Sequence, residues 1–308
     1  MRRERGIALL FALWALALLA ALLAGLALGA RGESEAARQL YSQAQARYAA
    51  EAGVARAISA LRDGNSAHRW VPDGRTYRFE FGGAQVVVRI EDVTGQVDLN
   101  AATPDVLTDL FLAAGASNSQ ARALSDAVQD WRDSDDIPHT FGAEADAYKR
   151  AGMKWLPRNG PFRTPGELAR VYGMTDALYR KVAGAVTVYS GRNFPDPQYA
   201  GPLAMAAGRD GDLADATRIV EARRARAPAA TNANPMQAAA GLQPQTPLAG
   251  LGGLTQEIRS VATMPDGTQS GQDVVVRLTA VSGISRPYAV LGWRGFSEEP
   301  PEAAPDSP

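Results

Sequence analysis

Carboxylate side chains gather in one short stretch of this chain. Six of them stand between positions 130 and 146: Asp130, Asp133, Asp135, Asp136, Glu144 and Asp146. So many negative charges in a compact loop repel one another unless a cation or solvent lies between them. Calcium binds through about six to eight oxygen atoms and suits flexible acidic loops, so these residues are candidate metal ligands. A solvated run of charge is the alternative that the residues leave open.

The spacing of these acids does not match an EF-hand. Asp133, Asp135 and Glu144 fall on positions 1, 3 and 12 of such a loop. Position 5 is Ile137 and position 6 is Pro138, where an EF-hand needs an oxygen ligand and a glycine. The loop therefore indicates a cation site of another kind, and which of its carboxylates bind the ion stays open.

The other residues that could do chemistry argue against an enzyme. The chain has no cysteine, and its two histidines, His68 and His139, lie far apart. Thiol chemistry is thereby excluded, and a multi-histidine zinc site or a Ser–His–Asp triad is disfavoured. The acidic loop could supply a glycosidase-like carboxylate pair, and a deep cleft beside it would favour that alternative.

Aromatic residues alternate with the acids of the loop: Trp131, Phe141, Tyr148 and Trp155. We expect them to pack as a core beneath the loop, because large aromatic side chains gain most from burial. A surface for a partner or an exported substrate is the alternative.

Helical segments must position the loop. Thr103 can cap a helix over residues 105–114 with Pro104 at its first position, and Gly115 closes it. A second helix is expected over residues 119–131, immediately before the cluster of acids. Together they form one helix–turn–helix unit.

The same pattern returns further along the chain. Thr164-Pro165 opens a second unit, whose first helix ends at Tyr172-Gly173 and whose second runs over 175–186. A fainter third copy lies at 196–226, with Gly208 at the hairpin and its second helix over 216–224. These units are of the helix-hairpin-helix or SAM-like type.

Helix-hairpin-helix units often bind the DNA backbone, so a membrane-anchored DNA receptor of the competence type is an alternative function. The charges argue against it, because residues 91–146 hold twelve acids and only two arginines. Phosphate binding depends on Lys and Arg, and an acidic hairpin repels a duplex. The whole chain has a formal net charge of −1, which gives no global attraction to nucleic acid.

Strand patterns flank the helical region on both sides. Residues 76–81 and 85–92 alternate with period two around a Gly82-Gly83 turn. Further runs follow at 258–263, 274–280 and 288–293, after a long strand-free interval. We therefore expect one antiparallel sheet interrupted by a helical insertion, packed on a helix over residues 33–62. The predicted fold class is α+β.

The N-terminal segment is apolar and uncharged from Ile7 to Ala30. As a helix of this length it would be about 36 Å long, enough to span a bilayer with some tilt. Arg2, Arg3 and Arg5 precede it, which predicts a cytoplasmic N-terminus and a periplasmic body. A cleaved secretory signal and a plain signal anchor are the alternatives. The helical pattern continues to about residue 62, as in the stem of a type IV pilin.

This leader and stem, together with VDLNAA (97–102), DWRDSD (130–135) and GAE (142–144), resemble type II secretion system protein K, the large minor pseudopilin of the general secretion pathway. The resemblance covers nearly the whole chain. It is most specific over residues 92–190 and weakest over 227–253 and after Phe296.

The resemblance implies a type IV pilin-like fold: a long N-terminal helix on a small antiparallel sheet, with a large all-helical SAM-like insertion. It implies calcium within that insertion, where the six loop acids fall; Ala145 interrupts an acidic pair and puts one ligand in doubt. Prepilin peptidase would cut between Gly6 and Ile7, and the new N-terminus would be methylated. Phe11 stands where most pilins carry a glutamate, an absence typical of this family and consistent with a subunit at the fibre tip.

The expected organisation follows from these signals: a leader (1–6), a transmembrane half-stem (7–30), a periplasmic half-stem (31–64), first strands (76–92), a helical insertion (93–226), an Ala/Pro-rich linker (227–253), final strands (254–296) and a disordered tail (297–308). The expected function is to initiate or cap the pseudopilus that exports folded proteins from a Gram-negative cell, without catalysis. Expected partners are minor pseudopilins I and J, H or the major pseudopilin below them, prepilin peptidase and the inner-membrane assembly platform, but no nucleic acid.

Overall fold

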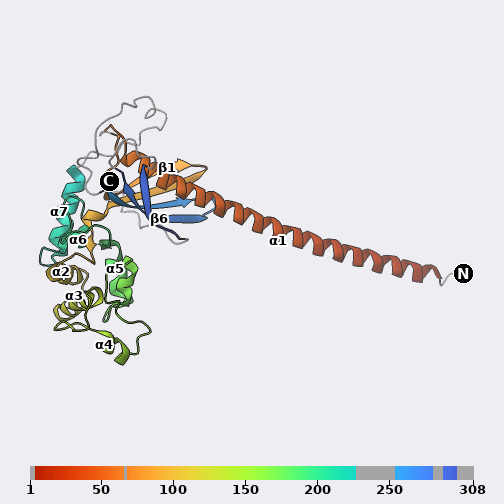
Figure 1. Ribbon diagram of the computed structural model, residues 1–308. Coiled ribbons are helices and arrows are strands. Elements are labelled where there is room, and N and C mark those ends of the chain that lie inside the picture. The colour runs from red at the N-terminus through yellow and green to blue at the C-terminus, as the bar shows by residue number, and fades with distance from the viewer. Residues whose placement is uncertain (1–3, 66–67, 227–253, 280–286, 297–308) are drawn as a thin grey trace.

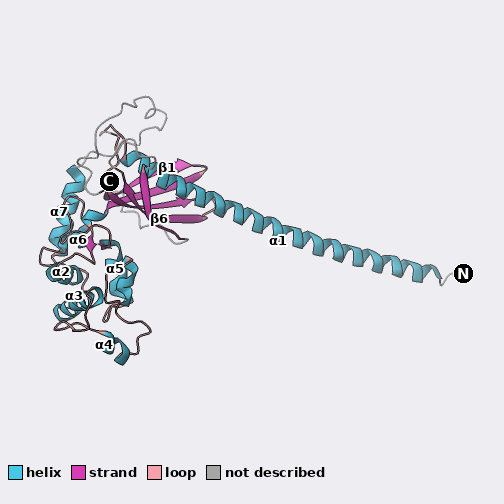
Figure 2. Ribbon diagram, in the orientation of Figure 1, coloured by secondary structure: helices cyan, strands magenta, loops and turns pink. Residues whose placement is uncertain are grey.

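The structure is a computed structural model that describes residues 4–65, 68–226, 254–279 and 287–296. The expected linker and tail, and residues 1–3 of the expected leader, lie outside these ranges. Helix α1 (Glu4–Leu61) projects from the body of the molecule toward the N-terminus (Figure 1). The body consists of a sheet, on which the end of α1 packs, and a helical part beside it (Figure 2).

The second half of α1 packs on the sheet through mostly small side chains. Gly53 is required at this contact, because a Cβ there would overlap the Ser260 hydroxyl on the facing strand. In the first half, Phe11 and Trp14 are 71% and 69% exposed. Within the part of the chain that the structure describes, no helix combines the length and hydropathy needed to cross a membrane. Among the α1 residues whose side chains the structure describes, the buried ones are Ser42, Ala46, Ala49, Ala50, Gly53, Val54, Ala57, Ile58 and Leu61.

Five antiparallel strands form the sheet, in the order β1-β2-β5-β6-β7. Their bounds are β1 (Asp73–Phe81), β2 (Ala84–Asp92), β5 (Thr255–Thr263), β6 (Gln269–Leu278) and β7 (Tyr288–Phe296). Strand β2 pairs along its length with β5, from Gln85↔Thr263 to Asp92↔Gln256. The prediction of a single sheet interrupted by an insertion is therefore confirmed. Gly82 and Gly83 form the β1–β2 turn with positive φ angles of 57° and 81°, which favour glycine.

The chain between β2 and β5 includes a second body, which we call the helical subdomain (residues 93–226). It has a hydrophobic core distinct from the one beneath the sheet. Its elements are η1 (Val93–Gly95), β3 (Val97–Asp98), α2 (Pro104–Ala113), α3 (Asn118–Arg132), α4 (Ala145–Arg150), η2 (Pro165–Arg170), α5 (Asp176–Val182), η3 (Ala183–Ala185), β4 (Val186–Thr187), α6 (Pro202–Ala206) and α7 (Leu213–Arg226).

The capping signals were confirmed in part. The Thr103 hydroxyl accepts a hydrogen bond from the Val106 N–H at the start of α2, and Thr175 caps α5 in the same way. The prediction at Thr164 was wrong, because η2 is a 3₁₀ helix and Thr164 makes no capping hydrogen bond. The helix expected over 175–186 ends at Val182, and its remainder is the 3₁₀ turn η3 and strand β4. The short parallel pair β3–β4 and the helix α4 were not predicted.

A joint connects the two bodies where β2 ends. Gly95 packs against the backbone that precedes α6: an added Cβ would lie 2.5 Å from the Tyr199 carbonyl carbon and 2.7 Å from the Ala200 nitrogen. Nearby, the Asp196 N–H donates to the Thr94 carbonyl at 2.7 Å. The guanidinium of Arg224 on α7 donates to the Asp73 carbonyl of β1 at 3.0 Å. The first two contacts fix the start of the helical subdomain to the segment before α6, and the Arg224 side chain connects α7 with β1 of the sheet.

We expect Gly95→Ala to loosen this joint, because neither neighbouring backbone atom can move independently of its segment. Overpacking of this kind costs about 1–3 kcal/mol, which urea unfolding would measure. Gly184→Ala is the matched control, since a Cβ at Gly184 meets no atom within 4 Å. Equal stabilities of the two variants would show that the contact at Gly95 is unimportant.

Candidate metal centre

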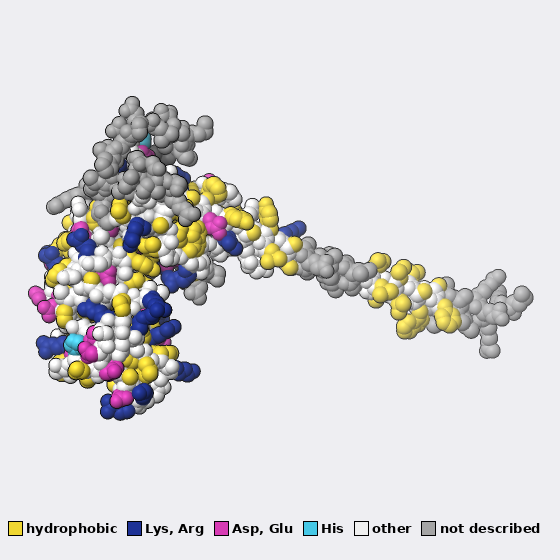
Figure 3. Space-filling view, viewed as in Figure 1, with side chains coloured by type: hydrophobic (Ala, Val, Ile, Leu, Met, Phe, Trp, Pro, Cys, Tyr) yellow, Lys and Arg dark blue, Asp and Glu magenta, His cyan; other side chains and the backbone are white. Residues whose placement is uncertain are grey.

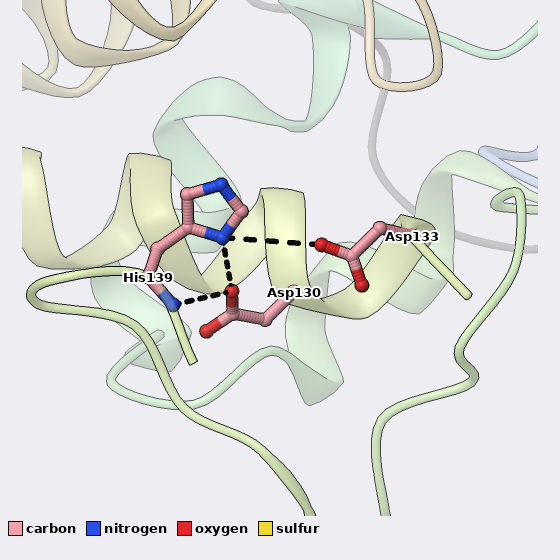
Figure 4. A group of neighbouring side chains, drawn as sticks. All are labelled: Asp130, Asp133 and His139. Atoms are coloured by element: carbon pink, nitrogen blue, oxygen red, sulfur yellow. Dashed lines mark hydrogen bonds and ion pairs between the residues drawn. The ribbon is translucent and has the colours of Figure 1, made fainter. Parts of the chain in front are cut away.

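Asp130 lies on the buried face of α3, near its C-terminal end, and is 0% exposed. Its Oδ1 accepts hydrogen bonds from the His139 backbone N–H at 3.0 Å and from His139 Nδ1 at 2.5 Å (Figure 4). The hydrogen bond to the carboxylate is the main cause that raises the pKa of His139. The second oxygen, Asp130 Oδ2, is buried and has no donor among the described residues.

Asp133 is the residue that caps the C-terminus of α3, one turn further along. Its Oδ2 lies 3.9 Å from His139 Nδ1, so Asp130, Asp133 and His139 converge (Figure 4). Its Oδ1 is buried and finds no donor in the described chain. Burial, followed by the negative charges of Asp135 and Asp130, raises the pKa of Asp133.

Glu144 returns the chain to this point immediately before α4. The residue is 7% exposed, and neither carboxyl oxygen receives a hydrogen bond from a described residue. Burial raises the pKa of Glu144 to about 7, with further contributions from Asp130, Asp133, Asp136 and Asp135. A buried carboxylate surrounded by carboxylates is strongly unfavourable without a positive partner.

Asn159 completes the arrangement from a separate loop. Its φ angle of 48° is left-handed, a conformation that asparagine tolerates better than most residues. The amide nitrogen donates to the Asp135 carbonyl at 3.0 Å and to Asp136 Oδ1 at 2.8 Å. The amide oxygen is buried and has no donor among the described residues.

Five oxygen atoms of four side chains thus lack a hydrogen donor within the described residues: Asp130 Oδ2, Asp133 Oδ1, both oxygens of Glu144 and Asn159 Oδ1. Unpartnered buried acceptors are costly, and a single cation would satisfy several at once. Carboxylate and amide oxygens are the donor set of hard divalent cations, calcium above all. The carbonyls at the end of α3 also favour positive charge. The types of donor atom therefore match those that calcium binds, and the side chains whose ligand atoms lie within 4.8 Å of one another are Asp130, Asp133 and His139.

A hydrolytic role for the loop has less support. A cavity of about 630 Å³ lies at the joint between the sheet and the helical subdomain, and none of the six loop carboxylates lines it. Three of the loop acids instead carry four of the unpartnered oxygens described above. Their arrangement suits ion binding better than the paired acid and base of a glycosidase.

The six predicted acids do not occupy equivalent places. Asp130, Asp133 and Glu144 present buried oxygens, whereas Asp135 and Asp136 are exposed. The Asp135 carboxylate accepts a hydrogen bond from the Ile137 N–H of its own loop, and that of Asp136 accepts one from Asn159. Asp146 lies outside the group: it is exposed and pairs with Lys149 at 3.3 Å. It is the least suited of the six to bind the same ion.

The prediction about the aromatic residues was half right. Trp131 and Tyr148 are buried in the core of the helical subdomain, with ring centroids 6.4 Å apart. Phe141 and Trp155 are 58% and 40% exposed, so the prediction that they are core residues was wrong. Both belong to loops, where local sequence alternation does not determine which side chains face inward.

Sequence reasoning missed two contributors to the site. Asn159 is distant in sequence, and only its Asn-Gly pairing hinted at a special backbone conformation. Gly142 is needed because a Cβ there would overlap Asp130 Oδ2. The predicted cleavage residues Gly6 and Ile7 lie in α1, with side chains outside the described part.

Comparison with known proteins shows which family this chain resembles. Residues 87–191 match the family model described as Type II secretion system (T2SS), protein K. Type II secretion system protein K from Klebsiella pneumoniae is 29% identical over 250 residues, covering 72% of this chain and 76% of that protein. A putative type II secretion system protein K from Escherichia coli K12 is 26% identical over 204 residues, covering 60% and 62% of the two chains.

The fold has a solved counterpart. A chain in the crystal structure of the GspK-GspI-GspJ complex from the enterotoxigenic Escherichia coli type 2 secretion system superposes with a TM-score of 0.56 at 16% identity. The match covers 87% of this chain and 99% of that one. Together these matches confirm the resemblance to type II secretion system protein K, and they do not favour the DNA-binding alternative.

We expect Glu144→Gln to stabilise the metal-free chain at alkaline pH. Because the folded-state pKa of about 7 exceeds the ordinary 4.5, stability from the protonated form is present below pH 4.5 and lost as the pH rises through 7. In the presence of a chelator, the variant should gain up to about 3 kcal/mol at pH 8 and nothing at pH 4, as measured by urea unfolding. Asp146→Asn is the control, and an equal gain there would contradict the prediction.

Proposed function

We propose that this chain is a non-catalytic minor pseudopilin of a type II secretion system, which initiates or caps the pseudopilus during export of folded proteins. The observation that carries the proposal is the family match over residues 87–191, the part that holds most of the helical subdomain. The fold similarity to a chain of the GspK-GspI-GspJ complex supports minor pseudopilins I and J as its partners.

A position at the tip fits the shape of the molecule. The helical subdomain stands beside the sheet, away from the projecting N-terminal part of α1 (Figure 1). Such a bulky body would obstruct repetition along a tight helical fibre. Phe11 supports the same position, because a subunit without a glutamate there cannot form the buried ion pair with the amine of a further subunit.

The N-terminal helix is the element proposed to enter the inner membrane and the fibre core. Large apolar side chains are exposed along its first half, and the space-filling view shows them far from the body (Figure 3). Isolated apolar helices need lipid or other helices around them. The helices of I and J, and below them H or the major pseudopilin, would supply this environment after prepilin peptidase has cut the chain and the new terminus is methylated. The inner-membrane assembly platform would receive the processed chain, with its body in the periplasm.

Calcium is the proposed ion of the acidic loop. Asp130, Asp133, Glu144 and Asn159 would hold it, and its positive charge would offset the mutual repulsion of the carboxylates. The ion would join the end of α3, the start of α4 and the Asn159 loop. Its role would be structural: it would stiffen the distal end of the helical subdomain.

Calcium affinity should depend on Glu144 and on pH. We expect Glu144→Gln to weaken binding by roughly 10- to 100-fold in isothermal titration calorimetry, and Asp146→Asn to leave it nearly unchanged. Since the ion must displace the proton of Glu144, whose pKa is about 7, wild-type affinity should fall roughly tenfold between pH 8 and pH 6. An equal loss in both variants would remove the assignment of Glu144 as a ligand.

Processing at Gly6 tests the secretion role. Mass spectrometry of the membrane-extracted protein should find a chain that starts at Ile7, with a methylated terminus, only in cells that contain prepilin peptidase. An intact Met1 in both strains would indicate a signal anchor, and a start near Arg31 a secreted protein. Either result would contradict the proposed function.

A further inference from the structure

A second carboxylate, which is half-buried, lies far from the acidic loop, at the joint. Glu257 stands on the central strand β5, directly opposite Glu91 of β2. Both line the 630 Å³ cavity between the sheet and the helical subdomain. Like charges facing each other across a strand pair are unfavourable, so this placement requires a compensating group.

The acids around Glu257 already have cationic partners. Arg89 binds Glu91, with its Nε 2.7 Å from Oε1, and Asp273 on β6 is contacted by Arg259 at 3.4 Å and Arg294 at 2.8 Å. Glu257 itself forms no ion pair with a described residue under the same distance criterion. Its partner is instead an amide: Gln96 Nε2 donates to Glu257 Oε2 at 2.7 Å and also lies 3.3 Å from Glu91 Oε2.

Gln96 is itself incompletely satisfied. It is 4% exposed, and its Oε1 has no donor among the described residues. Because an amide group is planar, this acceptor stands beside the nitrogen that already contacts Glu257. A proton on the Glu257 carboxyl would give it an O–H donor that Gln96 Oε1 can accept, while Gln96 Nε2 keeps its bond to the other carboxyl oxygen. The two side chains would then share a pair of opposed hydrogen bonds.

We propose that Glu257 and Gln96 form a proton-sensitive joint between the sheet and the helical subdomain. When Glu257 takes up a proton, both hydrogen bonds form and the joint is tight. When the proton leaves, one hydrogen bond is lost, Gln96 Oε1 stays unpaired, and a charge faces Glu91 and Asp273. Gln96 directly follows η1, where the chain enters the helical subdomain, so the change acts on the connection itself.

The surroundings place this change near neutral pH. Burial, then the charges of Asp273 and Glu91, raises the pKa of Glu257 to about 7, against the opposing effects of Gln96 and Arg259. The titratable and charged groups that line the same cavity are Arg89, Glu91 and Asp92 on β2, Arg259 on β5, Asp273 on β6, Arg294 on β7, Tyr179, Arg180 and Lys181 on α5, and Tyr199 before α6. The proposal does not depend on the secretion role.

The test measures the joint directly as a function of pH. Because the chain has no cysteine, Thr76→Cys on β1 and Ser119→Cys on α3 would give two unique, exposed positions for spin labels. Pulsed electron resonance on the full chain in detergent micelles would report the spread of distances between the two bodies. We expect a narrower distribution at pH 5.5 than at pH 8.5, with a midpoint near 7.

Two variants of the proposed pair and one control variant make the result decisive. Glu257→Gln keeps a neutral side chain that can both donate to and accept from Gln96, so its distribution should be narrow at both pH values. Gln96→Met removes the amide and should be broad at both. Glu80→Gln, an exposed acid on β1, should behave as wild type. A wild-type distribution that does not change with pH, or a change that persists in Glu257→Gln, would overturn the proposal.

Discussion

The pairing of β2 with β5 is the constraint on which the rest of the molecule depends. The two strands are adjacent in the sheet although the whole helical subdomain lies between them in the chain. Their pairing brings both ends of the intervening segment to the same end of two neighbouring interior strands, and it completes the surface on which α1 packs. The helical subdomain can therefore keep a core of its own while remaining fixed to the stem. Closing so long a segment costs entropy, but that cost grows only slowly with its length.

At the far end of the helical subdomain, buried charged groups constrain the structure. Asp130 is buried because it belongs to the inward face of α3, and two hydrogen bonds from His139 account for only one of its oxygens. Glu144 is brought to the same place by the start of α4. Two buried carboxylates in one loop do not stabilise a fold alone, so the arrangement makes physical sense as half of an ion site.

Much of this architecture could be predicted because its signals are local. Alternation identified β2 and β5, glycines marked the β1–β2 turn, and Thr103-Pro104 marked the start of α2. The cation that the composition of the acidic loop indicates stays a prediction. Local signals could not show which residues, distant in the sequence, lie close together in space. Asn159 reaches the loop from a separate segment, and Gln96 meets Glu257 across 161 positions. Thr164-Pro165 has the same letters as a capped start, yet the short segment after it forms a 3₁₀ turn.

Burial is the main cause that raises the pKa of two carboxyl groups, those of Glu144 and Glu257. Their neighbours make the consequences differ. Around Glu144 several oxygens of described residues lack donors, and the proposed divalent cation would satisfy more of them than one proton can. Glu257 faces a single amide whose unpaired atom is an acceptor, and a proton satisfies that pair completely. Since the two groups belong to different bodies with separate cores, acidification would oppose the ion at one end of the helical subdomain while it tightens the joint at the other. The same chemical group, placed among different neighbours, would thus give two opposite responses to pH.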